Sequence, residues 1–179
     1  MKISGAEKLI LTMLCDISES QTKKGKVSDV DPAFVREALD QDCSWALQWQ
    51  YSGLLGDDGS NPPYVKQVAD ILDMWDQLED HYEELSEDEK TLLIAKASLP
   101  VEGIKFKGFD GNNETNLMVT ARFFVKSMNM FERFEKRNMN SHSPSLDMHL
   151  RMLKAYQGLT SFTLGVDELA DVMNARKYQ

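Results

Sequence analysis

Two short polar segments carry the side chains most suited to chemistry. Residues 108–114 offer carboxylate and amide oxygens, the ligands that hard cations prefer, although these are fewer than the six or more that calcium takes. Residues 140–144 place a hydroxyl beside a histidine, the side chain that gains or loses a proton near neutral pH. The candidate polar site therefore consists of Asp110, Asn112, Asn113, Glu114, Asn140, Ser141 and His142.

Both segments also have a structural interpretation, which we favour. Asp110 or Asn112 can cap the helix that follows, and Glu114 suits the positive end of its dipole. Asn140 and His142 can hydrogen-bond the backbone of their own loop. A serine nucleophile is not favoured, because adjacent side chains rarely point together and no nucleophile-elbow glycine pattern is present.

The other reactive residue types indicate structure rather than catalysis. His81 and His149 are read as ordinary, partly buried histidines, and Cys15 and Cys43 as two buried thiols without a bridge or a zinc site. The zinc motif HExxH, the phosphate-binding P-loop, the dinucleotide motif GxGxxG and the redox motif CxxC do not occur. We therefore predict no resident metal and no cofactor.

Three basic residues form the candidate anion-binding group: Arg122, Lys126 and Arg133. Their spacings of four and seven place them on one face if a single helix holds all three. They can either face the acidic row of residues 70–84 or lie open to an anion. We favour the first interpretation, because residues 70–89 contain ten acidic residues and only one basic residue.

The spacing of apolar residues predicts an all-α fold. Apolar side chains recur at intervals of three and four, which is the period of an amphipathic helix. In the first helix, which begins after Ser4, one stripe contains Leu9, Ile10, Met13, Leu14 and Ile17. We expect a helical bundle of seven or eight helices around a long central helix that continues to about residue 137.

That central helix decides whether the two polar segments can meet. A helix of ~26 residues is roughly 40 Å long, so the segments would begin at its opposite ends. One shared site would then require a helix that breaks early, or a partner chain.

Length and composition indicate one globular domain over residues 1–179. The chain has a net charge of −9 and is 42% hydrophobic. A chain of this length buries roughly 70% of the surface that it exposes when unfolded. Gly56–Pro63 is the strongest loop signal and could be a linker, but the residues before it offer little core for an independent domain.

The same composition narrows the partners and the compartment. An acidic surface repels phosphate backbones, so we do not expect nucleic acid as a partner. Apolar runs are too short to span a membrane. Glu7 places a charge where the apolar region of a signal peptide would begin. We therefore expect a cytoplasmic protein that does not associate with membranes.

Several motifs together resemble the YfbU family of bacterial proteins. They are Lys105–Glu114, Ala121–Phe123, Phe131–Phe134, Asn140–Pro144 and Arg151–Leu153, with Glu7–Leu11 near the N-terminus. The resemblance covers nearly the whole chain and implies an all-helical cytosolic protein that self-associates. It implies no established activity and no catalytic residues.

Our leading hypothesis is an uncharacterised protein that acts by binding a small-molecule ligand or a protein partner, and that forms a homo-oligomer. The wide apolar face of the central helix and ten methionines leave room for a subunit interface. The alternative is an enzyme, a metal-assisted hydrolase that uses Asp110, Glu114 and His142.

Overall fold

A computed structural model describes residues 2–22, 29–56, 61–100, 102–160 and 163–177. Over these ranges the regular elements are helices and no strand is present, which confirms the predicted all-α class. The elements are α1 (Gly5–Thr22), α2 (Pro32–Asp40), α3 (Ser44–Gln50), α4 (Ser52–Leu55), α5 (Pro63–Glu84), α6 (Glu87–Ala97), α7 (Thr115–Lys126), the short 3₁₀ helix η1 (Glu132–Phe134), α8 (Leu146–Gln157) and α9 (Val166–Asn174).

The chain forms two compact units, residues 1–65 and residues 66–179. Their boundary lies in the first turn of α5, just after the loop Gly56–Pro63, of which residues 57–60 lie outside the described residues. A chain that divides into two compact units can hold one domain or two. A single domain over residues 1–179 therefore stays a prediction.

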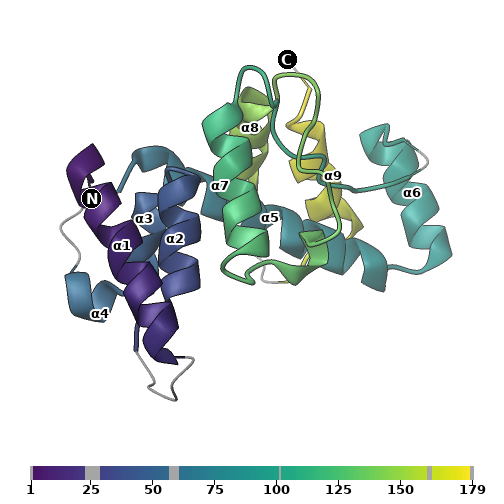
Figure 1. Ribbon diagram of the computed structural model, residues 1–179. Helices are drawn as coiled ribbons and strands as arrows, with labels where there is room; N and C mark the ends of the chain where they lie inside the picture. The colour runs from purple at the N-terminus through teal and green to yellow at the C-terminus, as the bar shows by residue number, and fades with distance from the viewer. Residues whose placement is uncertain (1, 23–28, 57–60, 101, 161–162, 178–179) are drawn as a thin grey trace. The chain divides into compact units, whose positions relative to one another are not determined.

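In the first unit, α1 packs on α2, α2 on α3 and α3 on α4 (Figure 1). The start of α1 has a reciprocal cap, in which Ser4 N donates to the Glu7 carboxylate over 2.8 Å and Glu7 N donates to Ser4 Oγ over 3.3 Å. Asp31 caps α2 by accepting from Ala33 N over 2.9 Å, and Pro32 follows at the first helical position. The core of this unit includes Val35, Ala38, Leu39, Trp45 and Leu47.

One face of α1 is apolar and exposed. The stripe predicted from the sequence is present, but each of its five side chains is between 53% and 62% exposed. Beside it, a pocket of about 430 Å³ is lined by apolar side chains of α1 and α4, including Ile10, Leu11, Leu54 and Leu55. The stripe and this pocket together are called the α1 face below.

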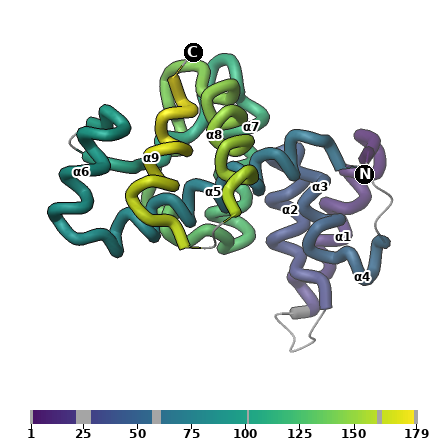
Figure 2. The backbone as a smooth tube through the Cα atoms, turned by 180° about the vertical axis from the view of Figure 1, so that it is seen from behind, coloured from purple at the N-terminus to yellow at the C-terminus, as the bar shows by residue number. Residues whose placement is uncertain are grey.

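In the second unit, α9 packs against α6 and α8 (Figures 1 and 2). The longest helix is α5, which buries Val68, Ile71, Leu72, Met74 and Leu78. Most of α7 is buried as well, at Leu117, Met118, Thr120, Ala121, Phe123, Phe124 and Val125. Most of the apolar surface of α7, which the sequence suggested as a subunit interface, is therefore buried.

The helix predicted to continue to about residue 137 ends at Lys126, so that prediction is wrong beyond this residue. Asn129 and Phe131 have positive φ angles of 52° and 54°, which no helix accommodates. The chain then forms η1, whose Phe134 is fully buried. Phe134 therefore continues the apolar spacing that suggested a longer helix, but it is buried from η1, after the chain has turned.

The early end of α7 also separates the predicted basic stripe. Arg133 lies on η1 rather than on the helix of Arg122 and Lys126. Its guanidinium pairs with acidic residues of α5, with Asp76 at 3.0 Å and with Asp80 and Glu83. For Arg133, these ion pairs agree with the favoured interpretation, in which the basic residues face the acidic row.

The other two members of the stripe lie on α7. Arg122 donates to the backbone oxygen of Asn138 over 2.8 Å, and Lys126 is exposed. Arg122 therefore joins α7 to the segment that follows η1.

Both cysteines are buried and free, as predicted. Burial raises the pKa of the Cys43 thiol to about 11, which keeps it protonated and poorly nucleophilic near neutral pH. None of the helices in the described ranges is both long and apolar enough to cross a membrane.

Candidate functional site

The early end of α7 brings the two polar segments together. Phe109 and Asn140 form an isolated parallel β-bridge. Phe109 N donates to Met139 O and Ser141 N donates to Phe109 O, both over 3.1 Å. The expectation that the two segments lie far apart is therefore wrong, and a helix that breaks early is the reason.

Gly108 permits this close approach of the two segments. Its φ is +94°, a conformation that L side chains rarely adopt, and an added Cβ would lie 2.1 Å from the backbone carbonyl of Met139. Only glycine fits between the two backbones at this position.

Glu114 joins the first polar segment to the start of α8. Its Oε1 accepts from Ser145 N and Leu146 N, each over 2.7 Å, and its Oε2 accepts from Asp110 N and Ser145 Oγ over 2.9 Å. Burial raises the pKa of this carboxyl, but the hydrogen bonds from Leu146, Asp110 and Ser145 outweigh burial and hold the pKa below its ordinary value. Glu114 therefore acts as an ionised cap on α8 rather than on its own helix.

Asp110 organises the turn before α7. One of its carboxylate oxygens accepts from Asn112 N over 3.0 Å, and the other accepts from the Asn113 side chain. These hydrogen bonds, together with the charge of His142, hold the pKa of Asp110 below its ordinary value despite burial. The structural interpretation of this residue, a cap at the start of the helix, therefore describes its contacts well.

The second segment is held mainly by Asn140. Its Oδ1 accepts from Gly111 N over 3.1 Å and from His142 N over 2.9 Å. Ser141 Oγ donates to the backbone oxygen of Ser143 and not to the exposed ring of His142. The two neighbours thus make separate contacts, as expected from their adjacency.

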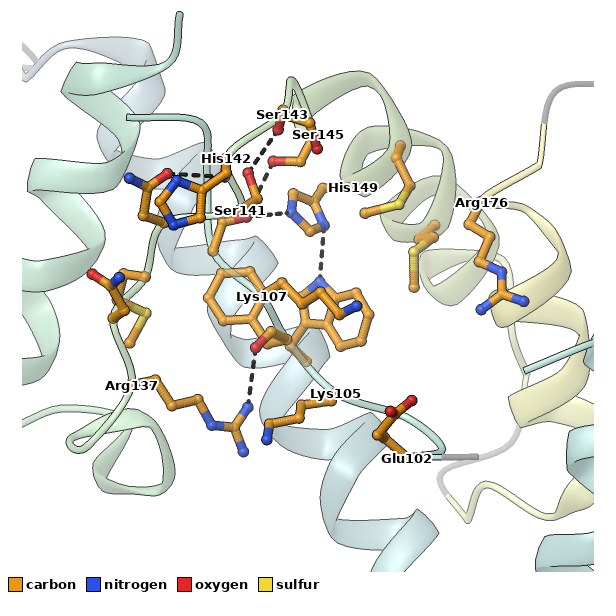
Figure 3. Close-up of a pocket in the computed structure, with 18 of the residues that line it drawn as sticks. Glu102, Lys105, Lys107, Arg137, Ser141, His142, Ser143, Ser145, His149 and Arg176 are labelled. Carbon is orange, nitrogen blue, oxygen red and sulfur yellow. Dashed lines mark hydrogen bonds between the residues drawn. The ribbon is translucent and has the colours of Figure 1, made fainter. Parts of the chain in front are cut away.

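His149 belongs to this site, although the sequence suggested an ordinary, partly buried histidine. It is 1% exposed, and its ring joins the first segment to α5 (Figure 3). Trp75 Nε1 donates to its Nδ1 over 3.0 Å, and its Nε2 lies 3.1 Å from Gly108 O. Since Nδ1 accepts, Nε2 must carry the proton and the ring is neutral.

Burial favours the same neutral state. It lowers the pKa of His149 to about 4, although the hydrogen bond to Gly108 and the charge of Glu114 favour protonation. The ring is therefore a fixed neutral connector rather than a proton donor near pH 7.

A buried ion pair holds the strand-like segment before Gly108. Glu79 accepts from Phe106 N over 2.6 Å, and Arg137 reaches the same carboxylate over 2.5 and 2.6 Å. Glu79 is buried, and each of its oxygens accepts a hydrogen bond from these donors. The paired arginine fixes the spacing between α5 and the segment that follows η1.

Next to the joined segments lies a cleft of about 750 Å³ within residues 75–176. Lys105 and Lys107 extend into its opening, with Arg137 on one side and Arg176 on the other (Figure 3). Ser141, His142 and Ser143 form another part of the wall, whereas Asp110, Asn112, Asn113 and Glu114 do not line it. We call this feature the basic cleft.

The geometry supports the metal-assisted hydrolase less well than the structural interpretation of the two polar segments. The oxygens of Asp110 and Glu114 already accept hydrogen bonds from neighbouring donors. In the part of the chain that the structure describes, no three His, Cys, Asp or Glu side chains are grouped so as to hold a metal ion. The joined segments are therefore built to hold one another.

The fold and the site define a helical protein with two interlocked polar segments, a basic cleft and an exposed apolar helix. Comparison with known proteins gives the family. The YfbU domain matches residues 1–175, so the chain belongs to the YfbU family, as the motifs predicted.

One relative is UPF0304 protein MJECS11 of Methanocaldococcus jannaschii. It is 30% identical over 115 residues, which are 60% of this chain and 65% of the relative. The match thus spans less than two thirds of that protein. Since this relative is archaeal, a bacterial source for the present chain stays a prediction.

Proposed function

We propose that this protein acts by binding rather than by catalysis, and that its partner is a second copy of the same chain docked on the α1 face. The observation that carries the proposal is the exposure of five large apolar side chains on one helix face: Leu9, Ile10, Met13, Leu14 and Ile17. Contiguous exposed apolar surface of this kind marks an interaction site.

The pattern of the stripe is self-complementary. The midpoint of α1 lies between Met13 and Leu14. If two copies of α1 pack antiparallel about a two-fold axis at that point, Met13 faces Leu14 and Ile10 faces Ile17 of the second copy. Four of the five stripe side chains then meet an apolar side chain, and Leu9, farthest from the axis, faces Ser18.

The neighbouring pocket supports the same arrangement. Leu54 and Leu55 of α4 are 73% and 47% exposed and extend the apolar surface beyond α1. An interface with an apolar centre and a recess beside it can reach the size of about 800 Å² per partner that stable complexes use. A second copy presents the same apolar surface and recess on its own α1 face.

The test is a substitution at the proposed two-fold axis with a matched control. Full burial of a leucine contributes ~1.5–3 kcal/mol, so a half-exposed one retains about 1 kcal/mol for association. Leu14→Lys removes this contribution from both copies and places two like charges together. We expect the dissociation constant to rise at least roughly thirtyfold.

The matched control is Leu92→Lys on α6. Leu92 is 54% exposed, against 53% for Leu14, and the substitution changes mass and charge identically. Sedimentation velocity over a range of concentrations compares the two variants with the unmodified chain. The proposal is supported if Leu14→Lys weakens association and Leu92→Lys does not. Equal behaviour of the two variants, or an unmodified chain that stays monomeric, contradicts it.

A further inference from the structure

We propose that the basic cleft binds a small organic anion, a carboxylate or phosphate ester with an apolar body. This site lies within residues 75–176 and is independent of the α1 face. A volume of about 750 Å³ is within the range of pockets that hold metabolite-sized ligands.

The charge of the cleft opposes the charge of the chain. The whole chain carries −9, yet the cleft is lined by five cationic side chains and one carboxylate: Lys105, Lys107, Lys136, Arg137 and Arg176 against Glu102. Of these cations, Arg137 is neutralised by Glu79. The other four take part in none of the ion pairs found among the described residues.

Local structure explains why two lysines point into the opening. Residues 105–107 belong to no helix, and exposed and buried side chains alternate along them. Phe106 is buried at 2% exposure, and Lys105 and Lys107 on either side of it are exposed. With Phe106 turned inward, the lysines on either side of it leave the backbone on the exposed side.

Arg176 contributes a fixed positive charge to the cleft. Its Nη2 donates to Ala97 O over 2.9 Å and to Ser98 O over 2.6 Å, which holds the guanidinium in place with neutral acceptors only. Burial lowers the pKa of Arg176 because its charge is partly desolvated. An anion in the cleft would offset that cost and use the remaining N–H groups of the fork.

The remaining lining selects for an organic ligand. Pro100 and Pro144 are exposed at the cleft and Met148 is half-buried, so they offer apolar surface next to the cations. Ser141 and Ser143 add hydroxyl groups. A ligand with one anionic group and an apolar portion matches both parts of this wall.

The experiment measures thermal stabilisation by two anions, each paired with its neutral counterpart. Adenosine monophosphate is compared with adenosine, and octanoate with octanol, at millimolar concentration and low salt. We expect at least one anion to raise the melting temperature and its neutral counterpart to do so less. The identity of the effective anion distinguishes a phosphate ester from a carboxylate.

Paired lysine variants then locate the effect. Lys105→Gln with Lys107→Gln should weaken the binding of the effective anion roughly tenfold, since two close charges are lost. The control is Lys126→Gln with Lys154→Gln, which removes two exposed lysines outside the cleft. No stabilisation by either anion, equal stabilisation by the neutral compounds, or equal loss in the control overturns the proposal.

Discussion

Replacement of Glu114 by glutamine tests whether one carboxylate holds the two polar segments together. The glutamine oxygen can still accept from Ser145 N and Leu146 N. An NH₂ group, which only donates, then replaces the accepting Oε2. The Ser145 hydroxyl can turn to Gly108 O, which already lies 3.1 Å away, and accept from the new NH₂. The N–H of residue 110 loses its acceptor and faces a donor.

These changes give the expected magnitude. A buried backbone donor without an acceptor costs ~1–3 kcal/mol, and each of two charge-assisted hydrogen bonds loses about 1 kcal/mol on becoming neutral. Glu114→Gln should therefore lower the free energy of unfolding by about 3–5 kcal/mol. Urea denaturation at pH 7, followed by far-ultraviolet circular dichroism, measures the difference.

The control is Glu89→Gln in the capping box of α6. Glu89 also accepts from a backbone N–H and a serine hydroxyl, both of Ser86, but on the exposed surface, where glutamine serves the same role. We expect little change in the urea midpoint for this variant. If the two variants lose equal stability, the reasoning about Glu114 is wrong.

The pH dependence gives a second test of the same residue. Because the pKa of Glu114 is lower in the folded state, its stabilisation is present above the ordinary value of 4.5 and is lost as the pH falls below it. Glutamine has no such titration. The difference in stability between the unmodified chain and Glu114→Gln should therefore narrow below pH 4.5, and a constant difference down to pH 3 contradicts this role.

Three further predictions concern the same unit. Gly108→Ala should lower the free energy of unfolding by at least about 3 kcal/mol, because its Cβ meets backbone, whereas Gly158→Ala, with contacts of 3.4 Å or more, should change it little. Arg137→Met should lower the free energy of unfolding by about 3–5 kcal/mol, because it leaves a buried carboxylate without its ion-pair partner. Arg133→Met should lower it by about 1 kcal/mol, because the partners of Arg133 are more exposed. The pKa of His149 is about 4 in the folded protein, against an ordinary value of 6.5. The free energy of unfolding should therefore fall by about 3 kcal/mol as the pH drops from above 6.5 towards 4, and His149→Gln should remove most of that fall. Urea midpoints measured for each pair of variants, and over pH 7 to 4 for His149→Gln, check these values; equal effects within a pair, or an unchanged pH profile, contradict them.

Local signals in the sequence predicted much of the fold. The acid and proline at residues 31 and 32 predict a helix start, and α2 begins there; Ser86 with Glu89 predicts a capping box, and α6 has one. Apolar residues at helical spacing between 64 and 85 predict a helix, and α5 is Pro63–Glu84. These features depend on residues within one or two turns of each other, which a sequence displays directly.

The end of α7 was harder to predict because burial and helical spacing gave conflicting signals. Phe134 continues the helical apolar pattern, yet it is buried from η1. Asn129, which tolerates positive φ, was the only local sign of a break. A helix that continued to residue 137 would place the two polar segments at its opposite ends.

The site depends on contacts that no local pattern contains. Glu114 and Ser145 are 31 residues apart, and Trp75 and His149 are 74 apart. Ser143 and Pro144 predict a helix start, but α8 begins at Leu146, where the carboxylate of Glu114 accepts from the backbone N–H of the first helical residue. A histidine on an apolar helix face, in a chain with a buried tryptophan, was the one signal that could have included His149.

We propose that this chain functions through association with a second copy of itself. Sedimentation equilibrium of the unmodified protein, from low micromolar to about 100 μM, measures the mass in solution without any substitution. We predict a concentration-dependent rise from the mass of one chain to that of two, with no larger species. A mass of one chain throughout that range would contradict the claim.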